Sequence, residues 1–207
     1  MLNILAIESA STICGTALFL EGELTEITEI EQPRIHGEKL PLMVQEILRS
    51  HSTTVHDLDG IAISSGPGSY TGLRIGMSLA KGLAATANLP LIPVSTLRGM
   101  HYGLGDKAGT WIALHSHKDL VFLQQFEGEH PSSEIMCESF DKSKYYPLAG
   151  YNLDKLCGDD EYVKAIPSSE YIGKLAVRNF KEWAESKINE VIPNYVTNFN
   201  IGVTRSL

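Results

Sequence analysis

The sequence predicts an α/β fold in which mixed β-sheets are flanked by helices. Residues 3–7 form a short, nearly all-apolar run, which is typical of a strand buried on both faces. Residues 60–87 begin with a second apolar run, pass through a Gly-Pro-Gly turn and continue with helical periodicity. The elements expected over residues 1–103 follow the order βββαβαβα, which predicts helices crossing over a mixed sheet.

The first three strands are expected to form a meander. After the run at residues 3–7, β-type residues resume at 13–20, and Glu21-Gly22 supplies a turn. Residues 24–30 alternate imperfectly between apolar and polar side chains, which predicts an edge strand with one solvated face.

Two helices and two further strands follow the meander. Residues 37–51 repeat apolar side chains at helical spacing and predict an amphipathic helix. Ser69 or Thr71 can cap the helix that ends near Ala87, because a hydroxyl oxygen accepts N–H bonds from the first helical turn. The other elements expected here are strands at 61–63 and 91–94 and a short helix from Ser95 or Thr96 to Gly103.

Residues 103–109 are rich in glycine and charge, and they predict a boundary between a first lobe, residues 1–104, and a smaller second lobe, residues 105–207. Signals in the second lobe are weaker. The expected elements are a hairpin at 111–114 and 120–126, a weak strand at 135–138, an irregular stretch at 141–151, a short strand at 163–166, a helix capped by Ser168 or Ser169, and an extended tail at 193–207.

Composition excludes several classes of function. The chain has 25 acidic and 17 basic residues, a net charge of -8 and no dense Lys/Arg block, so it is not expected to hold nucleic acid alone. Its 3 cysteines are widely separated and lack metal-type spacing, which indicates a reducing compartment. Glu8 and Ser9 interrupt the opening apolar run too early for a membrane span or signal peptide, so we expect a cytoplasmic protein.

The helix expected at 71–87 is apolar around most of its circumference. Only Arg74, Ser78 and Lys81 form a polar seam, whereas an ordinary surface helix has one apolar stripe. Such a helix needs cover on two sides. Its own sheet can supply one side, and a second helix or a second chain the other. The pattern also fits a helix that is simply central to its own domain, and both interpretations remain open.

The loop Gly66–Gly72 could bind phosphate or serve as a structural turn. Backbone N–H groups at a helix start bind anions. However, the loop lacks the Gly-Lys-Ser/Thr of a Walker loop, and Thr71 stands where a dinucleotide loop needs glycine, so a structural turn is favoured. Residues 8–12 could likewise contact a phosphate or a metal through Glu8 and its neighbouring hydroxyls. A polar hairpin connection is the favoured interpretation there as well.

The histidines offer no convincing catalyst. His115, His117 and Asp119 alternate and would lie on one face of a continuous strand as metal ligands, but the expected hairpin turn falls at this point. His36 with Glu38 is typical of a helix start. The sequence contains no nucleophile with an identifiable base and no HExxH motif.

Several strings in the first half resemble the TsaB (YeaZ) family. They are residues 3–12, His36 with Leu40-Pro41, residues 65–76, residues 80–84 and residues 93–97; the string Gly66–Gly76 is the most specific. The similarity is dense to about residue 100 and thin afterwards. Glu8 stands where the family usually has Asp, and His115-Ser-His117 where it commonly has Asp-Ala-Arg. The resemblance implies an actin-like ATPase (ribonuclease H-like) fold with two lobes, the second reduced.

The resemblance also implies a function. Family members belong to the bacterial machinery that makes N6-threonylcarbamoyladenosine at position 37 of tRNAs reading codons that begin with A. They pair with a catalytic paralogue, TsaD, and a small ATPase, TsaE; they act as non-catalytic scaffolds and form homodimers through the same surface. No cofactor is expected on this chain alone, with ATP or ADP placed at the interface of the complex, and tRNA is contacted only through the complex.

Together with the helix pattern, the resemblance predicts a partner interface on two adjacent helices. Its predicted members are His36, Leu40, Met43, Ile47, Tyr70, Leu73, Arg74, Met77, Ala80, Lys81 and Ala84. Three alternatives remain: an active ATPase or kinase of the actin-like fold, a metallopeptidase, and a homodimeric module of some other assembly. Magnesium-dependent ATP hydrolysis or bound zinc in the isolated chain would indicate one of the enzymes.

Overall fold

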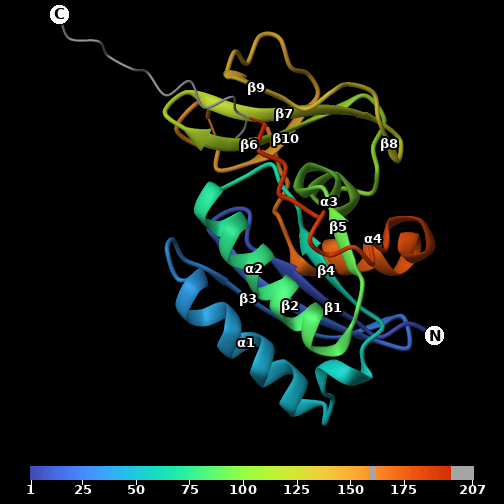
Figure 1. Cartoon of the computed structure of the whole chain (residues 1–207). Coiled ribbons are helices and arrows are strands. Elements are labelled where there is room, and N and C mark those ends of the chain that lie inside the picture. Colours follow the sequence, from blue (N-terminus) through green and yellow to red (C-terminus); the bar gives the residue numbers. More distant parts are fainter. Residues whose placement is uncertain (159–161, 197–207) are drawn as a thin grey trace, which may run out of the picture.

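The computed structural model describes residues 1–158 and 162–196, which form two β-sheets with helices packed around them (Figure 1). The predicted tail at 193–207 therefore lies outside the described residues from residue 197 onwards. In chain order the elements are β1 (Ile4–Glu8), β2 (Ile13–Leu20), β3 (Glu23–Glu31), α1 (His36–Ser50), η1 (Val55–Asp57), β4 (Gly60–Ser64), α2 (Tyr70–Ala87), β5 (Leu91–Val94), α3 (Thr96–Gly103), β6 (Thr110–His117), β7 (Leu120–Glu127), β8 (His130–Pro131), β9 (Met136–Ser139), β10 (Leu148–Tyr151), β11 (Val163–Lys164) and α4 (Ser169–Trp183).

The first sheet has the strand order β3-β2-β1-β4-β5. Strands β1, β2 and β3 form the predicted antiparallel meander, whereas β4 and β5 run parallel to β1. Parallel neighbours need crossover connections, and α1 and α2 supply them. The mixed α/β class is thereby confirmed, and β3 lies at the sheet edge as its broken alternation predicted.

Both faces of the first sheet are covered by helices. Successive strand residues point to opposite faces. Leu5 and Ile7 of β1 therefore pack in the cluster formed with α1 and α2, and Ile4 and Ala6 pack in the cluster formed with α4. This two-sided burial explains why β1 is apolar throughout.

The second sheet has the order β11-β10-β6-β7-β8, and β9 pairs with β7. It lies beyond α3, which separates it from the first sheet (Figure 1). The expectation of an irregular stretch at 141–151 is wrong for its last part, because Leu148–Tyr151 forms the buried strand β10. This strand depends on parallel pairing with β6 and β11, which no local pattern reveals.

Helix α4 returns from the second lobe to the first sheet. Its Ile172, Leu175 and Ala176 are buried against β1, β2, β4 and β5. The proposed division at residues 104 and 105 stays a prediction, and the structure places residues 169–183 of the predicted second lobe with the first.

Two helical glycines provide a matched test of this packing. A Cβ added at Gly173 of α4 would overlap the ring of buried Phe19, whereas a Cβ at Gly82 of α2 would meet nothing within 4 Å. Gly173→Ala is expected to destabilise the fold by about 1–3 kcal/mol through overpacking. Gly82→Ala is expected to stabilise it by about 0.5–1 kcal/mol through helix propensity. Urea unfolding monitored by circular dichroism measures both, and equal midpoints for Gly173→Ala and wild type would contradict the packing of α4.

Candidate functional site: an interlobe cleft and a two-helix surface

A cleft of about 680 Å³ lies between the two lobes. Its walls come from the β1–β2 loop, the N-terminus of α2, the β6–β7 hairpin and residues 194–196. Arg34, His36, His115 and His117 are among the lining residues, and no acidic side chain appears among those that the structure describes there. The cleft thus brings together most of the segments that carry the sequence-predicted polar sites.

The glycine loop before α2 is packed tightly against the β1–β2 loop. A Cβ at Gly68 would overlap Ala10 O, and a Cβ at Gly72 would overlap Ser9 O. The Ser69 N–H donates to Ala10 O at 2.7 Å. Ser69 Oγ also accepts from Gly72 N at 3.2 Å, which confirms Ser69 rather than Thr71 as the cap. The glycines therefore serve close backbone approach, as the structural-turn interpretation requires.

Glu8, at the end of β1 just before Ser9 and Ala10, is fully buried. Its Oε1 accepts from Ala10 N at 2.6 Å, and its Oε2 has no hydrogen-bond partner among the described residues. Burial raises the pKa of Glu8 to about 8. The side chain is therefore predominantly neutral at pH 7, and a neutral carboxyl is a poor ligand for a divalent cation.

The histidines make local hydrogen bonds. A β-bulge between His115 and His117 breaks the alternation that would have placed them on one face with Asp119. His115 Nε2 donates to Lys118 O at 3.0 Å, and His117 Nδ1 lies 3.2 Å from Ser116 Oγ. Within residues 1–158 and 162–196, no group of three or more His, Cys, Asp or Glu side chains is arranged to hold a metal ion.

His36 connects α1 to the first sheet. Its Nε2 donates to Ile13 O at 3.0 Å and its side chain is buried. Glu38 instead lies on the surface beside Lys39, 2.9 Å from its ammonium group. His36 and Glu38 therefore do not form a pair.

Most of the predicted interface lies in the chain's own core. The buried members are His36, Leu40, Met43, Ile47, Leu73, Met77, Ala80 and Ala84. Tyr70 and Arg74 are exposed, and Lys81 is half-buried. Helix α2 obtains its two-sided cover from the first sheet and from α1, so the buried members stabilise this fold. The partner role of the set stays a prediction. Of its members, only Tyr70, Arg74 and Lys81 can contact a partner without rearrangement.

An apolar groove remains open between α1 and α2. It has a volume of about 370 Å³, and Pro41, Leu48, Leu79 and Leu83 are among its lining residues. Leu42, which follows the groove-lining Pro41 in α1, is 54% exposed. Leu42 thus lies outside the buried stripe of α1.

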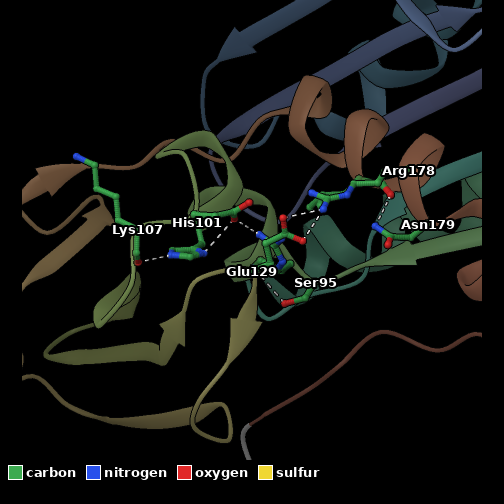
Figure 2. Close-up of polar contacts among 9 residues, drawn as sticks. Ser95, His101, Lys107, Glu129, Arg178 and Asn179 are labelled. Atoms are coloured by element: carbon green, nitrogen blue, oxygen red, sulfur yellow. Dashed lines mark hydrogen bonds and ion pairs between the residues drawn. The ribbon is translucent and has the colours of Figure 1, made fainter.

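A polar network that the sequence did not reveal joins the lobes near α3 (Figure 2). Arg98 Nη1 lies 2.5 Å from Asp106 Oδ1, and His101 Nε2 donates to Lys107 O at 2.9 Å. Arg178 of α4 donates to both oxygens of Glu129 at 2.5 and 2.7 Å. Burial lowers the pKa of His101, which stacks on the Phe126 ring at 4.4 Å. These contacts link α3 to the loop that follows it and α4 to the turn between β7 and β8.

A family model described as TsaD, tRNA N6-adenosine threonylcarbamoyltransferase, matches residues 27–152, which is more than half of the chain. The chain belongs to this family. Within it, the chain is similar to two proteins named tRNA threonylcarbamoyladenosine biosynthesis protein TsaB. The Escherichia coli K12 protein is 43% identical over 108 residues, covering 52% of this chain and 46% of that protein. The Haemophilus influenzae protein is 40% identical over 137 residues, covering 65% and 58%. The chain thus spans about half the length of the curated relatives it matches.

The fold is also that of a solved structure. The structure of YeaZ from Pseudomonas aeruginosa superimposes with a TM-score of 0.75 at 22% identity, covering 94% of this chain and 100% of the other. The predicted resemblance to TsaB (YeaZ) proteins is confirmed by the curated relatives, and the fold is that of the YeaZ structure. In the described part of the chain, no helix has the length and apolar character needed to span a membrane.

Glu8 gives the fold a specific pH dependence. In the unfolded chain its carboxyl ionises near the ordinary glutamate pKa of 4.5, and in the folded chain its pKa is about 8. Between these values the folded state binds more protons, so this group's contribution to stability is lost as pH rises from about 4.5 to about 8. Glu8→Gln keeps a neutral side chain and should gain stability over wild type by about 1.4 kcal/mol per pH unit across this window.

Urea unfolding of wild type and Glu8→Gln at pH 5, 6, 7 and 8 measures this difference directly. Glu21→Gln, on the exposed turn after β2, is the matched control and should follow wild type at every pH. Parallel stability curves for wild type and Glu8→Gln would contradict a neutral Glu8.

Proposed function

We propose that this chain is a non-catalytic scaffold subunit of the complex that forms N6-threonylcarbamoyladenosine at position 37 of tRNAs reading codons that begin with A. It would bind a TsaD-type catalytic paralogue through the outer side of α1 and α2 and would contribute no catalytic side chain. The observation that carries the proposal is the apolar groove between these helices, together with the exposed Leu42 that follows groove-lining Pro41 in α1. The TsaB names of the curated relatives support the pathway.

The condition of the cleft supports a non-catalytic role. In an actin-like ATPase, the loops after the strands must accept a phosphate and an ionised carboxylate must hold its cation. Here the glycine loop is filled by contact with Ser9 and Ala10, and Glu8 is neutral at pH 7. We therefore propose that the chain alone binds no nucleotide and that ATP or ADP is held at the interface of the complex.

Calorimetric titration of ATP with magnesium should give no heat of binding with the chain alone and a measurable one with the complex.

The remaining partners follow from the same proposal. A net charge of -8 disfavours contact with the tRNA backbone, so the tRNA is held through the paralogue. A TsaE-type ATPase completes the complex in the cytoplasm. Without the paralogue, two copies of this chain pair through the same helices.

Co-expression with the paralogue from the same genome, followed by size-exclusion chromatography, tests whether the two proteins form a complex. Separate elution under all nucleotide conditions would refute the proposed function.

Leu42 tests the surface without disturbing the core. Leu42→Lys places a charge on the exposed side of α1 and should weaken binding to the paralogue at least tenfold, about 1.4 kcal/mol. Substitutions such as Ala80→Glu would instead bury a charge in this chain's own core. Ile27→Lys on β3 is the matched control, since Ile27 is 38% exposed and lies at the sheet edge. Surface plasmon resonance compares the two variants, and equal affinities would exclude the two-helix surface.

A further inference from the structure

A second pocket lies where β7 of the second sheet meets β5 and the end of α4. We call it the β7 pocket; its volume is about 400 Å³, and Pro93, Gln124, Phe126, Pro131 and Trp183 are among its lining residues. Among the residues that the structure describes, it shares none with the interlobe cleft. A mainly apolar pocket of this size that contains a few polar groups is typical of a site for a small organic molecule.

Gln124 is a polar residue in an apolar row of β7. Successive residues of a strand alternate between its faces, so Gln124 shares a face with Phe122 and Phe126, both of which belong to a hydrophobic cluster. Gln124 itself is only 8% exposed. An amide in such a position is unfavourable unless its polar atoms are hydrogen-bonded.

Only one end of the Gln124 amide has a partner in the described part of the chain. Its Nε2 donates to Ser133 O at 3.1 Å, which fixes the orientation of the amide. Its Oε1 accepts from none of the described residues, but it remains accessible, unlike the sealed and unpaired Oε2 of Glu8. A small molecule that carries an N–H group can therefore satisfy Gln124 Oε1 at the wall of the pocket.

The formal charges at the pocket wall are already compensated. Arg98 lines the pocket, and its Nη1 lies 2.5 Å from Asp106 Oδ1. Glu129 also lines the pocket, and both of its carboxylate oxygens accept from Arg178 (Figure 2). A charged ligand would thus lose its hydration without gaining an unpaired countercharge. The β7 pocket therefore favours a neutral molecule.

The apolar wall favours a ligand with an aromatic ring. Trp183, the last residue of α4, is half-buried, and Pro131 on β8 is exposed. An aromatic ring buries a large apolar area at little cost in conformational entropy, and it can stack on tryptophan or pack against the edge of its ring.

We propose that the β7 pocket binds a small, neutral aromatic amide, which donates an N–H hydrogen bond to Gln124 Oε1 and packs its ring against Trp183. The inference does not depend on the proposed function, since none of the described lining residues belongs to α1 or α2. A bound ligand would contact both parts of the molecule, because Pro93 belongs to the first sheet and Gln124 to the second.

Benzamide is the probe, because it contains one aromatic ring, one amide and no charge. Titration into the ¹⁵N-labelled chain should shift the indole N–H signal of Trp183 and saturate with a Kd of about 1 mM or lower. The chain has 2 tryptophans, and the variant Trp111→Phe identifies the signal of Trp183. The absence of a saturable shift at about 10 mM benzamide would overturn the proposal.

Two relatives of benzamide test the chemistry of the site. N,N-dimethylbenzamide keeps the ring and the carbonyl but has no N–H group, so it should bind at least tenfold more weakly. Benzoate has the size of benzamide but carries a negative charge, and it should also bind at least tenfold more weakly. Equal affinity for the dimethyl compound would refute the hydrogen bond to Gln124, and equal or tighter binding of benzoate would refute the preference for a neutral ligand.

Gln124→Met removes the amide and keeps the length of the side chain, and it should weaken benzamide binding at least tenfold. Gln125→Met is the matched control, because Gln125 follows on β7, faces the opposite side of the sheet and does not line the pocket. It should bind within twofold of wild type.

Urea midpoints equal to wild type establish that both variants are folded. A destabilised Gln124→Met is replaced by Gln124→Leu, for which the same loss is expected. Benzamide affinity equal to wild type in the folded Gln124 variant would show that this side chain does not hold the ligand and would refute the proposed site.

Discussion

The contact between the glycine loop and the β1–β2 loop determines most of the other features of the molecule. Gly68 and Gly72 let the backbone before α2 lie directly on Ser9 and Ala10, where any side chain would overlap. This contact fixes the start of α2 against the loop that follows Glu8, a fully buried residue whose pKa is raised by its burial. The same few atoms therefore position the helix that carries the proposed interface.

Local patterns were sufficient to predict most helices and strands of residues 1–103. Helix α2 was recognised because Ser69 marks its start and helical spacing follows, and both signals depend only on neighbouring residues. Strand β10 was not recognised, since Leu148–Tyr151 acquires its pairing from β6 and β11, segments distant in sequence. The return of α4 to the first sheet was missed for the same reason: its capping residue, Ser168, could be identified locally, but the surface it covers could not.

The candidate interface shows a different limit of sequence reasoning. A helix that is apolar on most sides is expected to be covered on two sides. The pattern does not say whether the second covering element belongs to the same chain or to a partner. Helix α1 and the sheet together bury Met77, Ala80 and Ala84, so the signal that suggested a partner is largely explained within the chain. The residues that remain available, such as Leu42 and Arg74, are those that stand off the apolar stripe.

The segment after α4 shows how both internal packing and exposure arise in one stretch of chain. The segment after α4 pairs with β5, covers α2 near Lys81 and reaches the cleft at Asn194, so it contacts the first lobe at three levels. A segment that only closed the core would turn its apolar side chains inward, as Val191 does. Ile192, the next residue, points outward from the same fixed backbone. Because Val191 and Asn194 fix the backbone on either side, Ile192 stays in water, although burial of its apolar area would be favourable.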